Sequence, residues 1–243
     1  MITVILGMHR SGTSTIAGIL HLNNIIMGTY KTFWPRPLSQ NPKGFYENYD
    51  FRKINDSLLK KVNYNVESLE PTIPNIIFDE KLSSKMEKLI LKSNKENNDW
   101  GWKDPRTCLT INSWIQIFKN LKLEKEIKII FVSRKAISVA RSLNKRNDLP
   151  LEKGVELWET YTDRALDFCT KSKYKTFYCT FEELLINPNF ICEKLFYFLN
   201  RKWDPLIVDK FVDKSISKSG MGRGYKQSNK ITILENKIDL LLS

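Results

Sequence analysis

A phosphate-binding loop is encoded directly after the hydrophobic residues 2–6. The loop reads Gly-Met-His-Arg-Ser-Gly-Thr-Ser over residues 7–14. Its glycines keep the spacing of the G-x-x-x-x-G-K-[ST] loop of nucleotide triphosphatases, but Thr13 stands in the place of the lysine. In those enzymes the lysine contacts the outer phosphates and the next hydroxyl binds magnesium. The sequence therefore predicts a phosphate site in which Arg10 supplies the positive charge.

Charged and hydroxyl side chains also follow three later segments that read as strands. Lys103 ends the short apolar segment before an Asp-Pro pair. Arg134 follows the clearest predicted strand, Ser142 lies in the helix after it, and the segment 180–185 follows the last strand. In sheets whose strands alternate with helices, ligands bind at the carboxyl ends of the strands. We therefore expect these side chains to gather around the loop.

The hydrophobic patterns predict a single α/β domain over residues 1–243. We expect a P-loop-type three-layer fold with a central, mostly parallel sheet flanked by helices. A long surface segment rich in Pro, Gly and Asn is expected at 23–44. Strands are expected at 2–6, 100–103, 127–132 and 175–180. Helices are expected at 11–22, 51–62, 84–92, 110–121, 136–146, 150–170, 188–200, 204–213 and 231–242.

Composition excludes several classes of protein. A chain of 243 residues with 42% hydrophobic content is large enough for one domain with a proper core. No apolar run approaches the roughly 18 residues of a membrane helix, and no leader precedes the first strand, so we expect a cytoplasmic protein without a membrane segment. The widely spaced cysteines and two isolated histidines do not form a metal site, and we expect the cysteines to be buried thiols.

The formal net charge of +12 allows two interpretations. It indicates either an anionic partner that the basic surface attracts or a general excess of lysine. A recognition motif with interleaved stacking aromatics is missing from the sequence, so no nucleic-acid partner is expected.

Together, the loop and these strand ends resemble the sulfotransferases that use 3′-phosphoadenosine 5′-phosphosulfate (PAPS), most closely the bacterial and tyrosylprotein-type branches. The motifs that carry the resemblance follow one another in the order of the family. They are the loop at 9–14, Lys103-Asp104-Pro105, Arg134 with a serine eight residues later, and the aromatic-Glu-Glu-Leu segment 181–184.

The resemblance implies how the donor binds. Backbone N–H groups at a helix N-terminus suit the 5′-phosphosulfate, and the loop residues expected to bind it are Arg10, Ser11, Gly12, Thr13 and Ser14. Arg134 and Ser142 match the family's 3′-phosphate site, because a guanidinium and a hydroxyl hold a dianion by charge-assisted hydrogen bonds. The alternative for this pair is an ordinary basic helix start. Phe181 stands where the family often has tyrosine, and we expect it to pack in the core.

The resemblance also assigns two cationic catalytic residues, Arg10 and Lys103. They match the positions that neutralise charge on the departing phosphate oxygen. A sulfuryl group in transfer carries less negative charge than a phosphoryl group, so no metal is expected. The alternatives are a solvated loop arginine for Arg10 and, for Lys103, a structural salt bridge to Asp104 or a neighbour.

Glu47 is the candidate general base, since a glutamate in the comparable region takes the acceptor proton in several branches of the family. Its alternative role is that of an acidic residue stabilised at a helix N-terminus. His9 is the rival base, because imidazole titrates near neutral pH. Its place inside the loop favours a role in shaping that loop.

The predicted function is transfer of a sulfuryl group from PAPS to a hydroxyl or amine. Two alternatives stay open: a divergent P-loop kinase that uses Arg10 in place of lysine, and a non-enzymatic basic module that binds nucleotide or RNA. The acceptor has no readable code; carbohydrate, small metabolite, lipid head group and protein tyrosine are all compatible. We expect 23–44 and 63–98 to shape its pocket. The basic, glycine-rich stretch 218–226 either closes over the 3′-phosphate or is a flexible, solvated loop.

Overall fold

The centre of the protein is a parallel four-stranded sheet with the strand order β2-β1-β3-β4. The computed structural model describes all residues except 39–40, 65–70, 73, 78, 213–227 and 243. The strands are β1 (Ile2–Leu6), β2 (Trp100–Lys103), β3 (Ile127–Ser133) and β4 (Thr176–Thr180). All of them lie where the hydrophobic segments predict strands, within one residue at either end.

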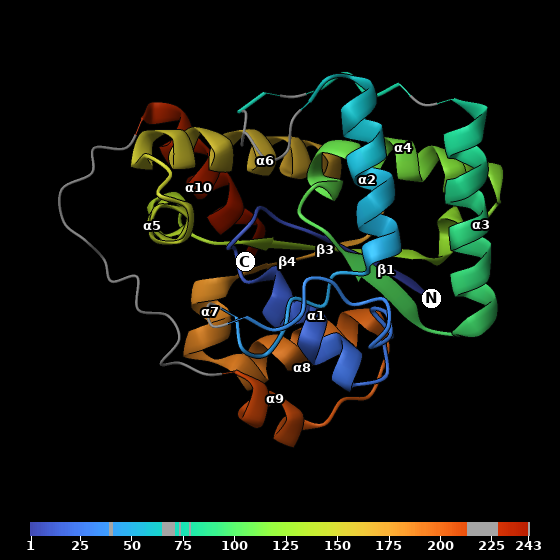
Figure 1. The fold of residues 1–243 in the computed structure, drawn as a ribbon. Coiled ribbons are helices and arrows are strands. Elements are labelled where there is room, and N and C mark those ends of the chain that lie inside the picture. The colour runs from blue at the N-terminus through green and yellow to red at the C-terminus, as the bar shows by residue number, and fades with distance from the viewer. Residues whose placement is uncertain (39–40, 65–70, 73, 78, 213–227, 243) are drawn as a thin grey trace.

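Helices cover both faces of the sheet and give the molecule three layers (Figure 1). One face carries α1 (Thr13–Leu22), α7 (Phe181–Ile186), α8 (Pro188–Leu199) and α9 (Pro205–Phe211). The other face carries α2 (Tyr49–Lys61), α3 (Glu80–Glu96), α4 (Thr107–Asn120), α5 (Ala136–Asn147), α6 (Leu151–Lys171) and α10 (Asn229–Leu242). A short 3₁₀ helix, Glu124–Glu126, precedes β3. The predicted α/β fold is confirmed.

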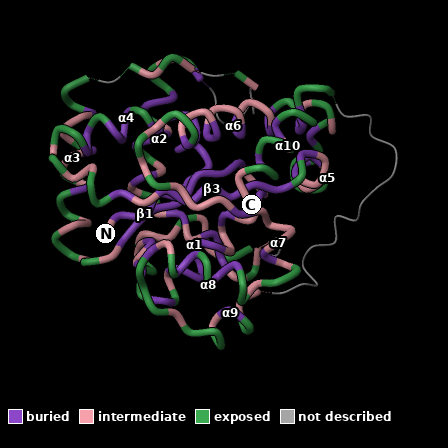
Figure 2. Tube along the Cα trace, turned by 180° about the vertical axis from the view of Figure 1, so that it is seen from behind, coloured by how far each residue is buried: buried purple, intermediate pink, exposed green. Residues whose placement is uncertain are grey.

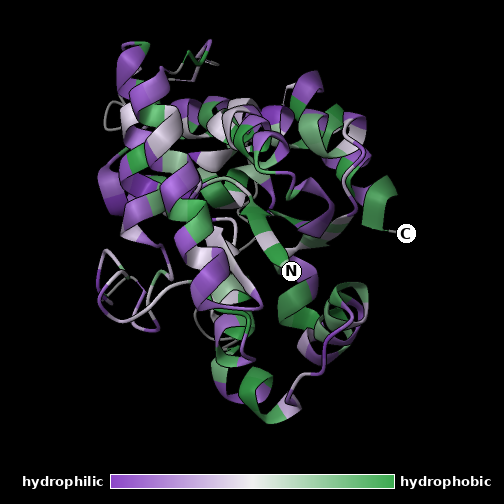
Figure 3. Ribbon diagram, turned by 90° about the vertical axis from the view of Figure 1, so that its right-hand side faces the viewer, coloured by the Kyte–Doolittle hydropathy of each residue, from purple (hydrophilic) through white to green (hydrophobic). Residues whose placement is uncertain are grey.

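The strands are apolar on both faces because both faces are covered. In β1, Ile2 and Val4 pack into the core under α2 to α6, whereas Ile5 packs into the core formed by α1, α8 and α9. Successive side chains of a strand point to opposite faces, so a sheet between two helical layers buries hydrophobic residues on both faces. Figure 2 shows β1 and β3 buried inside the molecule, whereas β4 is mostly half-buried. In Figure 3 the helices carry many hydrophilic residues.

Three helices differ from the prediction because positive φ angles or N-terminal capping residues determine where they begin. Helix α1 begins at Thr13 rather than at residue 11, because Arg10 and Gly12 have left-handed φ angles of 68° and 88°. Helix α7 is not predicted, and it forms because Thr180 and Glu183 make a reciprocal capping box. Helix α3 is longer than the predicted 84–92, since Asp79 caps its N-terminus.

The four cysteines are buried free thiols, as the sequence predicts. Burial raises the pKa of the Cys108 thiol to about 12, so the thiol is protonated at neutral pH. Among the described residues, no helix combines the length and the apolar character that a membrane span requires.

Candidate active site

The loop between β1 and α1 holds its shape through two left-handed residues. Arg10 has a φ of 68°, a backbone conformation that residues with a side chain seldom adopt. Gly12 has a φ of 88°, and a Cβ on it would lie 2.3 Å from the ring of Phe181. The Ser11 N–H donates to the Met8 carbonyl at 3.2 Å, and this bond closes the turn. The loop therefore delivers the chain directly to the N-terminus of α1, where the first N–H groups have no intrahelical acceptor.

The arginine of the loop reaches the helix after β3. Arg10 Nε donates to Ser142 Oγ on α5 at 2.8 Å. Arg134, which follows β3, donates from Nη1 to the Arg10 carbonyl at 3.3 Å. Arg10, Arg134 and Ser142 thus form one cluster at the carboxyl edge of the sheet. The sequence analysis assigns Arg10 to the 5′ end of a nucleotide and the other two residues to its 3′-phosphate.

This cluster carries excess positive charge. Burial, together with the charges of Arg146 and Arg134, lowers the pKa of Arg10 to about 10. Burial also lowers the pKa of Arg134, although Glu182 opposes the shift. Arg10 remains a cation at neutral pH, and within the described part of the chain no carboxylate pairs with it. Partly buried guanidinium groups that repel one another favour binding of an anion at this position.

A second feature of the loop also fits an oxyanion. The Ser11 hydroxyl is buried and has no hydrogen-bond partner among the described residues. A buried hydroxyl without a partner costs roughly 1–3 kcal/mol, so such a group is expected to meet a ligand or water. The orphaned Ser11 oxygen, the helix N-terminus and the arginine cluster together suit a phosphate or phosphosulfate group.

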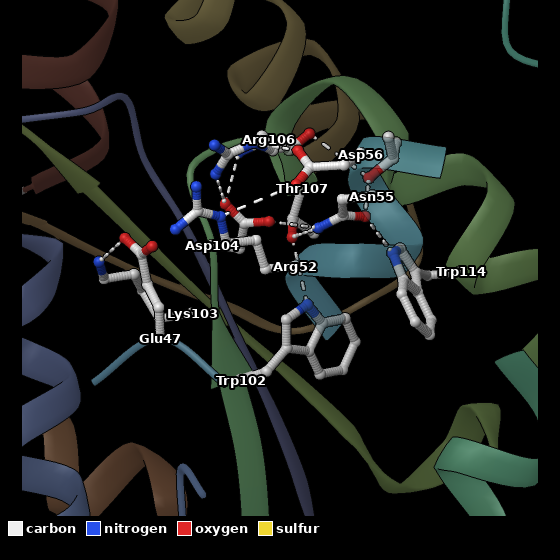
Figure 4. A network of polar contacts seen from close by, with 11 residues as sticks. Glu47, Arg52, Asn55, Asp56, Trp102, Lys103, Asp104, Arg106, Thr107 and Trp114 are labelled. Atoms are coloured by element: carbon white, nitrogen blue, oxygen red, sulfur yellow. Dashed lines mark hydrogen bonds and ion pairs between the residues drawn. The ribbon is translucent and has the colours of Figure 1, made fainter. Parts of the chain in front are cut away.

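Glu47 and Lys103 form a buried ion pair beside this cluster. Lys103 Nζ donates to Glu47 Oε1 at 2.7 Å, and the two side chains are 2% and 9% exposed. Lys103 is the last residue of β2, and Glu47 lies just before α2 (Figure 4). Lys103 therefore pairs with a neighbour in space rather than with Asp104, the adjacent residue in the chain.

Asp104 belongs instead to a polar network on the other side of β2 (Figure 4). Its Oδ1 accepts from the backbone and side chain of Arg106, and its Oδ2 accepts from Asn55 of α2 at 2.8 Å. Burial raises the pKa of Asp104, but the charge of Arg106 and the hydrogen bonds outweigh it and hold the pKa below its ordinary value. Asp104 is therefore a carboxylate.

Asn55 is the site residue that the sequence analysis misses. Its side chain is buried and hydrogen-bonded to the β2–α4 region. The available signal was its spacing, because Asn55 lies one turn after Phe51 on the apolar side of α2, where an amide is costly unless it is hydrogen-bonded.

His9 lies inside the loop with little capacity to accept a proton. Burial, followed by the charge of Arg106, lowers its pKa to about 3. Its ring packs edge-on against Tyr161 with centroids 5.8 Å apart. The neutral imidazole thus contributes to the packing of the loop, and its low pKa makes it a poor proton acceptor.

Phe181 packs against the loop rather than only in the core. Its ring meets Gly12, and the guanidinium of Arg134 lies 4.9 Å from the ring centroid. Glu182 accepts from the Lys135 backbone N–H at 3.2 Å, which ties α7 to the segment before α5. The stretch 218–226 lies outside the described residues.

Comparison with solved structures places this arrangement in a known fold. The chain superposes on the "Sulfotransferase Domain from the Synechococcus PCC 7002 Olefin Synthase" with a TM-score of 0.59 and 14% identity, over 98% of this chain and 94% of that one. The protein has a sulfotransferase fold. A second structure, the "Sulfotransferase Domain from the Curacin Biosynthetic Pathway", gives a TM-score of 0.58 and 14% identity over 98% of this chain and 97% of that one.

The likeness to solved sulfotransferase domains agrees with the resemblance of the sequence motifs. No protein-family profile matches the sequence, and no curated protein sequence matches it either. Within the described residues, no group of three or more His, Cys, Asp or Glu side chains lies close enough together to hold a metal ion.

Proposed function

We propose that this protein is a sulfotransferase that moves a sulfuryl group from PAPS to a hydroxyl or amine acceptor. The observation that carries the proposal is the pair of contacts that join Arg10 to Ser142 and Arg134 to the Arg10 carbonyl. The 5′- and 3′-phosphates of PAPS are attached to one ribose, so the groups that bind them must lie close together. The loop at 7–14 and the end of β3 satisfy this requirement, because Arg10 and Arg134 are hydrogen-bonded to each other.

Different residues of the cluster bind the two ends of the donor. The N–H groups of residues 10–14 and the buried Ser11 hydroxyl hold the 5′-phosphosulfate. Arg134 and Ser142 hold the 3′-phosphate by charge-assisted hydrogen bonds. When bound, PAPS supplies the sulfuryl group, and the chain positions it.

Glu47 acts as the general base. It takes the proton of the acceptor while the acceptor oxygen or nitrogen forms its bond to sulfur. The bond between sulfur and the 5′-phosphate oxygen breaks, and the electron pair stays on that oxygen. Lys103 and Arg10 neutralise the charge that develops there. The sulfuryl group carries little charge in transfer, so these two cations are sufficient and the scheme uses no metal.

The acceptor must present a nucleophile to the buried Glu47 carboxylate. The motifs resemble the bacterial and tyrosylprotein-type branches, and a carbohydrate, a small metabolite, a lipid head group or a protein tyrosine each meets this requirement.

A thermal-shift comparison tests the proposal. Adenosine 3′,5′-bisphosphate, the spent donor, is expected to raise Tm in the presence of EDTA, whereas ATP with magnesium is not. A ligand at a concentration of about 100 Kd stabilises the folded state by roughly 2.7 kcal/mol. Stabilisation by ATP with magnesium alone supports a P-loop kinase instead. Steeply salt-dependent RNA binding with no preference for a 3′-phosphate supports a nucleic-acid-binding module.

A further inference from the structure

Two side chains that the proposed chemistry requires come from different elements. Lys103 ends β2, and Glu47 lies two residues before the start of α2. Their contact of 2.7 Å is kept only if α2 and the β2–α4 unit hold a fixed relative position. Contacts between α2 and the β2–α4 unit, close to the Lys103–Glu47 pair, must therefore fix their relative position.

The Asn55 amide makes this connection. It is fully buried in the middle of α2, and among the described residues its hydrogen-bond partners all lie in the turn after β2 and in α4. Its Nδ2 donates to Asp104 Oδ2 at 2.8 Å and to Thr107 Oγ1 at 3.1 Å. Its Oδ1 accepts from Thr110 Oγ1 at 2.7 Å and from Trp114 Nε1 at 2.8 Å. An amide has two N–H donors and two acceptor lone pairs, so its full capacity is used.

Asp104 links the amide to the catalytic pair. It directly follows Lys103, is 0% exposed, and has both carboxylate oxygens occupied by Asn55 and Arg106. Asp104 contacts Asn55 of α2 and Arg106 at the start of α4, whereas Lys103, the last residue of β2, contacts Glu47. Figure 4 shows the Glu47–Lys103 pair on one side of β2 and the Asp104–Asn55 cluster on the other. The network thus also keeps Asp104 from competing for the Lys103 ammonium.

We propose that Asn55 and Asp104 are positioning residues whose mutual hydrogen bond holds Lys103 and Glu47 in the geometry needed for transfer. The inference rests on the proposed function for its effect on turnover. The effect on the geometry of the pair is independent of that function.

Substitutions of Asn55 test the effect on the Lys103–Glu47 geometry and the effect on turnover separately. Asn55→Asp puts an oxygen against the Asp104 carboxylate where an N–H donor stood, and Asn55→Ala removes the connection without adding charge. In both variants the contact between Lys103 Nζ and Glu47 Oε1 is expected to open beyond hydrogen-bond distance in a crystal structure. Turnover is expected to fall about 10- to 100-fold, because small misplacements of reacting groups are costly. The affinity for adenosine 3′,5′-bisphosphate stays unchanged, since the donor cluster lies on other elements.

The exchange variant Asn55→Asp/Asp104→Asn provides the rescue. The amide now comes from residue 104 and donates to the carboxylate at residue 55, while its oxygen still accepts from Arg106. Thr110 and Trp114 keep an acceptor at residue 55. The Lys103–Glu47 contact and most of the turnover are expected to return, and the double-mutant cycle measures the coupling of the two sites.

Asp56→Asn is the matched control. Asp56 is the next residue of α2 and forms an ion pair with Arg106, with Asp56 Oδ1 at 2.7 Å from Arg106 Nε, but its side chain is 43% exposed. We expect its turnover to stay near that of the wild type.

Three results would overturn the inference: an intact Lys103–Glu47 contact in folded Asn55→Ala, unchanged turnover in that variant, or a folded exchange variant that regains neither. A wild-type protein that binds no adenosine 3′,5′-bisphosphate would instead refute the proposed function. The crystallographic distances would still decide the positioning role.

Discussion

At the scale of single residues, the proposed chemistry depends on charged groups that are mostly buried. Glu47 and Lys103 are almost fully buried and pair with each other, and Arg10 keeps its charge although burial lowers its pKa to about 10. Buried charges without a catalytic or structural task are rare, because desolvation makes them costly. These residues are consequently where substitutions separate chemistry from stability.

Glu47→Gln is expected to lower turnover about 10²–10⁴-fold, the usual contribution of general base catalysis. Donor affinity should persist, because the Arg10–Ser142–Arg134 cluster does not include Glu47. Steady-state kinetics and a titration with adenosine 3′,5′-bisphosphate measure the two effects.

Removing one charge of the buried pair also costs stability. Glu47→Gln is therefore compared with Glu47→Gln/Lys103→Met, in which no uncompensated ammonium remains. Loss of donor affinity in proportion to loss of stability in both variants would make Glu47 a structural residue.

His9 makes stability depend on pH in the acid range. Its pKa is about 3 in the folded protein and 6.5 when unfolded, so between these values the unfolded chain binds a proton that the folded chain does not. Stability therefore falls as the pH drops below 6.5, by about 2 kcal/mol at about pH 5.

Urea unfolding of wild type and His9→Gln over this range measures the contribution. The variant is expected to lose less stability on acidification. Parallel pH profiles would mean that folding does not lower the pKa of His9.

At the scale of elements, the phosphate loop depends on close contact between segments that are distant in sequence. Gly12 needs both a left-handed backbone and room for the Phe181 ring, to which a Cβ would come within 2.3 Å. Gly12→Ala is expected to destabilise the protein and to weaken donor binding, because the loop must move away from α7.

Gly44→Ala is the matched control for this substitution. Gly44 has a similar φ of 91°, but the nearest atom to an added Cβ lies at 3.7 Å. The difference between the two Tm changes isolates the clash with Phe181, and Phe181→Ala should recover part of the loss at Gly12. Equal effects at both glycines would show that backbone conformation alone is responsible.

The elements show what the sequence can and cannot predict. The strands were predictable because β1 and β3 consist mostly of apolar, largely β-branched residues, and the loop because its glycine spacing is recognisable. Helix α7 was missed because a local capping box, rather than hydrophobic periodicity, starts it. The role of Asn55 was missed for a different reason: its partners lie about 50 residues away in the chain, and only the packing of α2 on α4 brings them together.

At the scale of the whole molecule, the formal charge of +12 bears on how an anionic donor arrives. If the basic surface steers the donor, its association rate constant should fall steeply as salt increases, while the dissociation rate changes little. Stopped-flow binding of a fluorescent adenosine 3′,5′-bisphosphate analogue measures both rates. An association rate that is insensitive to salt would assign the charge to a general excess of lysine.

The most direct test of the central claim is a calorimetric titration that compares adenosine 3′,5′-bisphosphate with adenosine 5′-phosphate in EDTA. The account places a 3′-phosphate against Arg134 and Ser142, beside the loop that holds the 5′-group. Charge-assisted hydrogen bonds contribute roughly 1.5–3 kcal/mol each, so the bisphosphate is expected to bind at least about tenfold more tightly. Equal affinity for the two nucleotides, or binding that requires magnesium, would contradict the account.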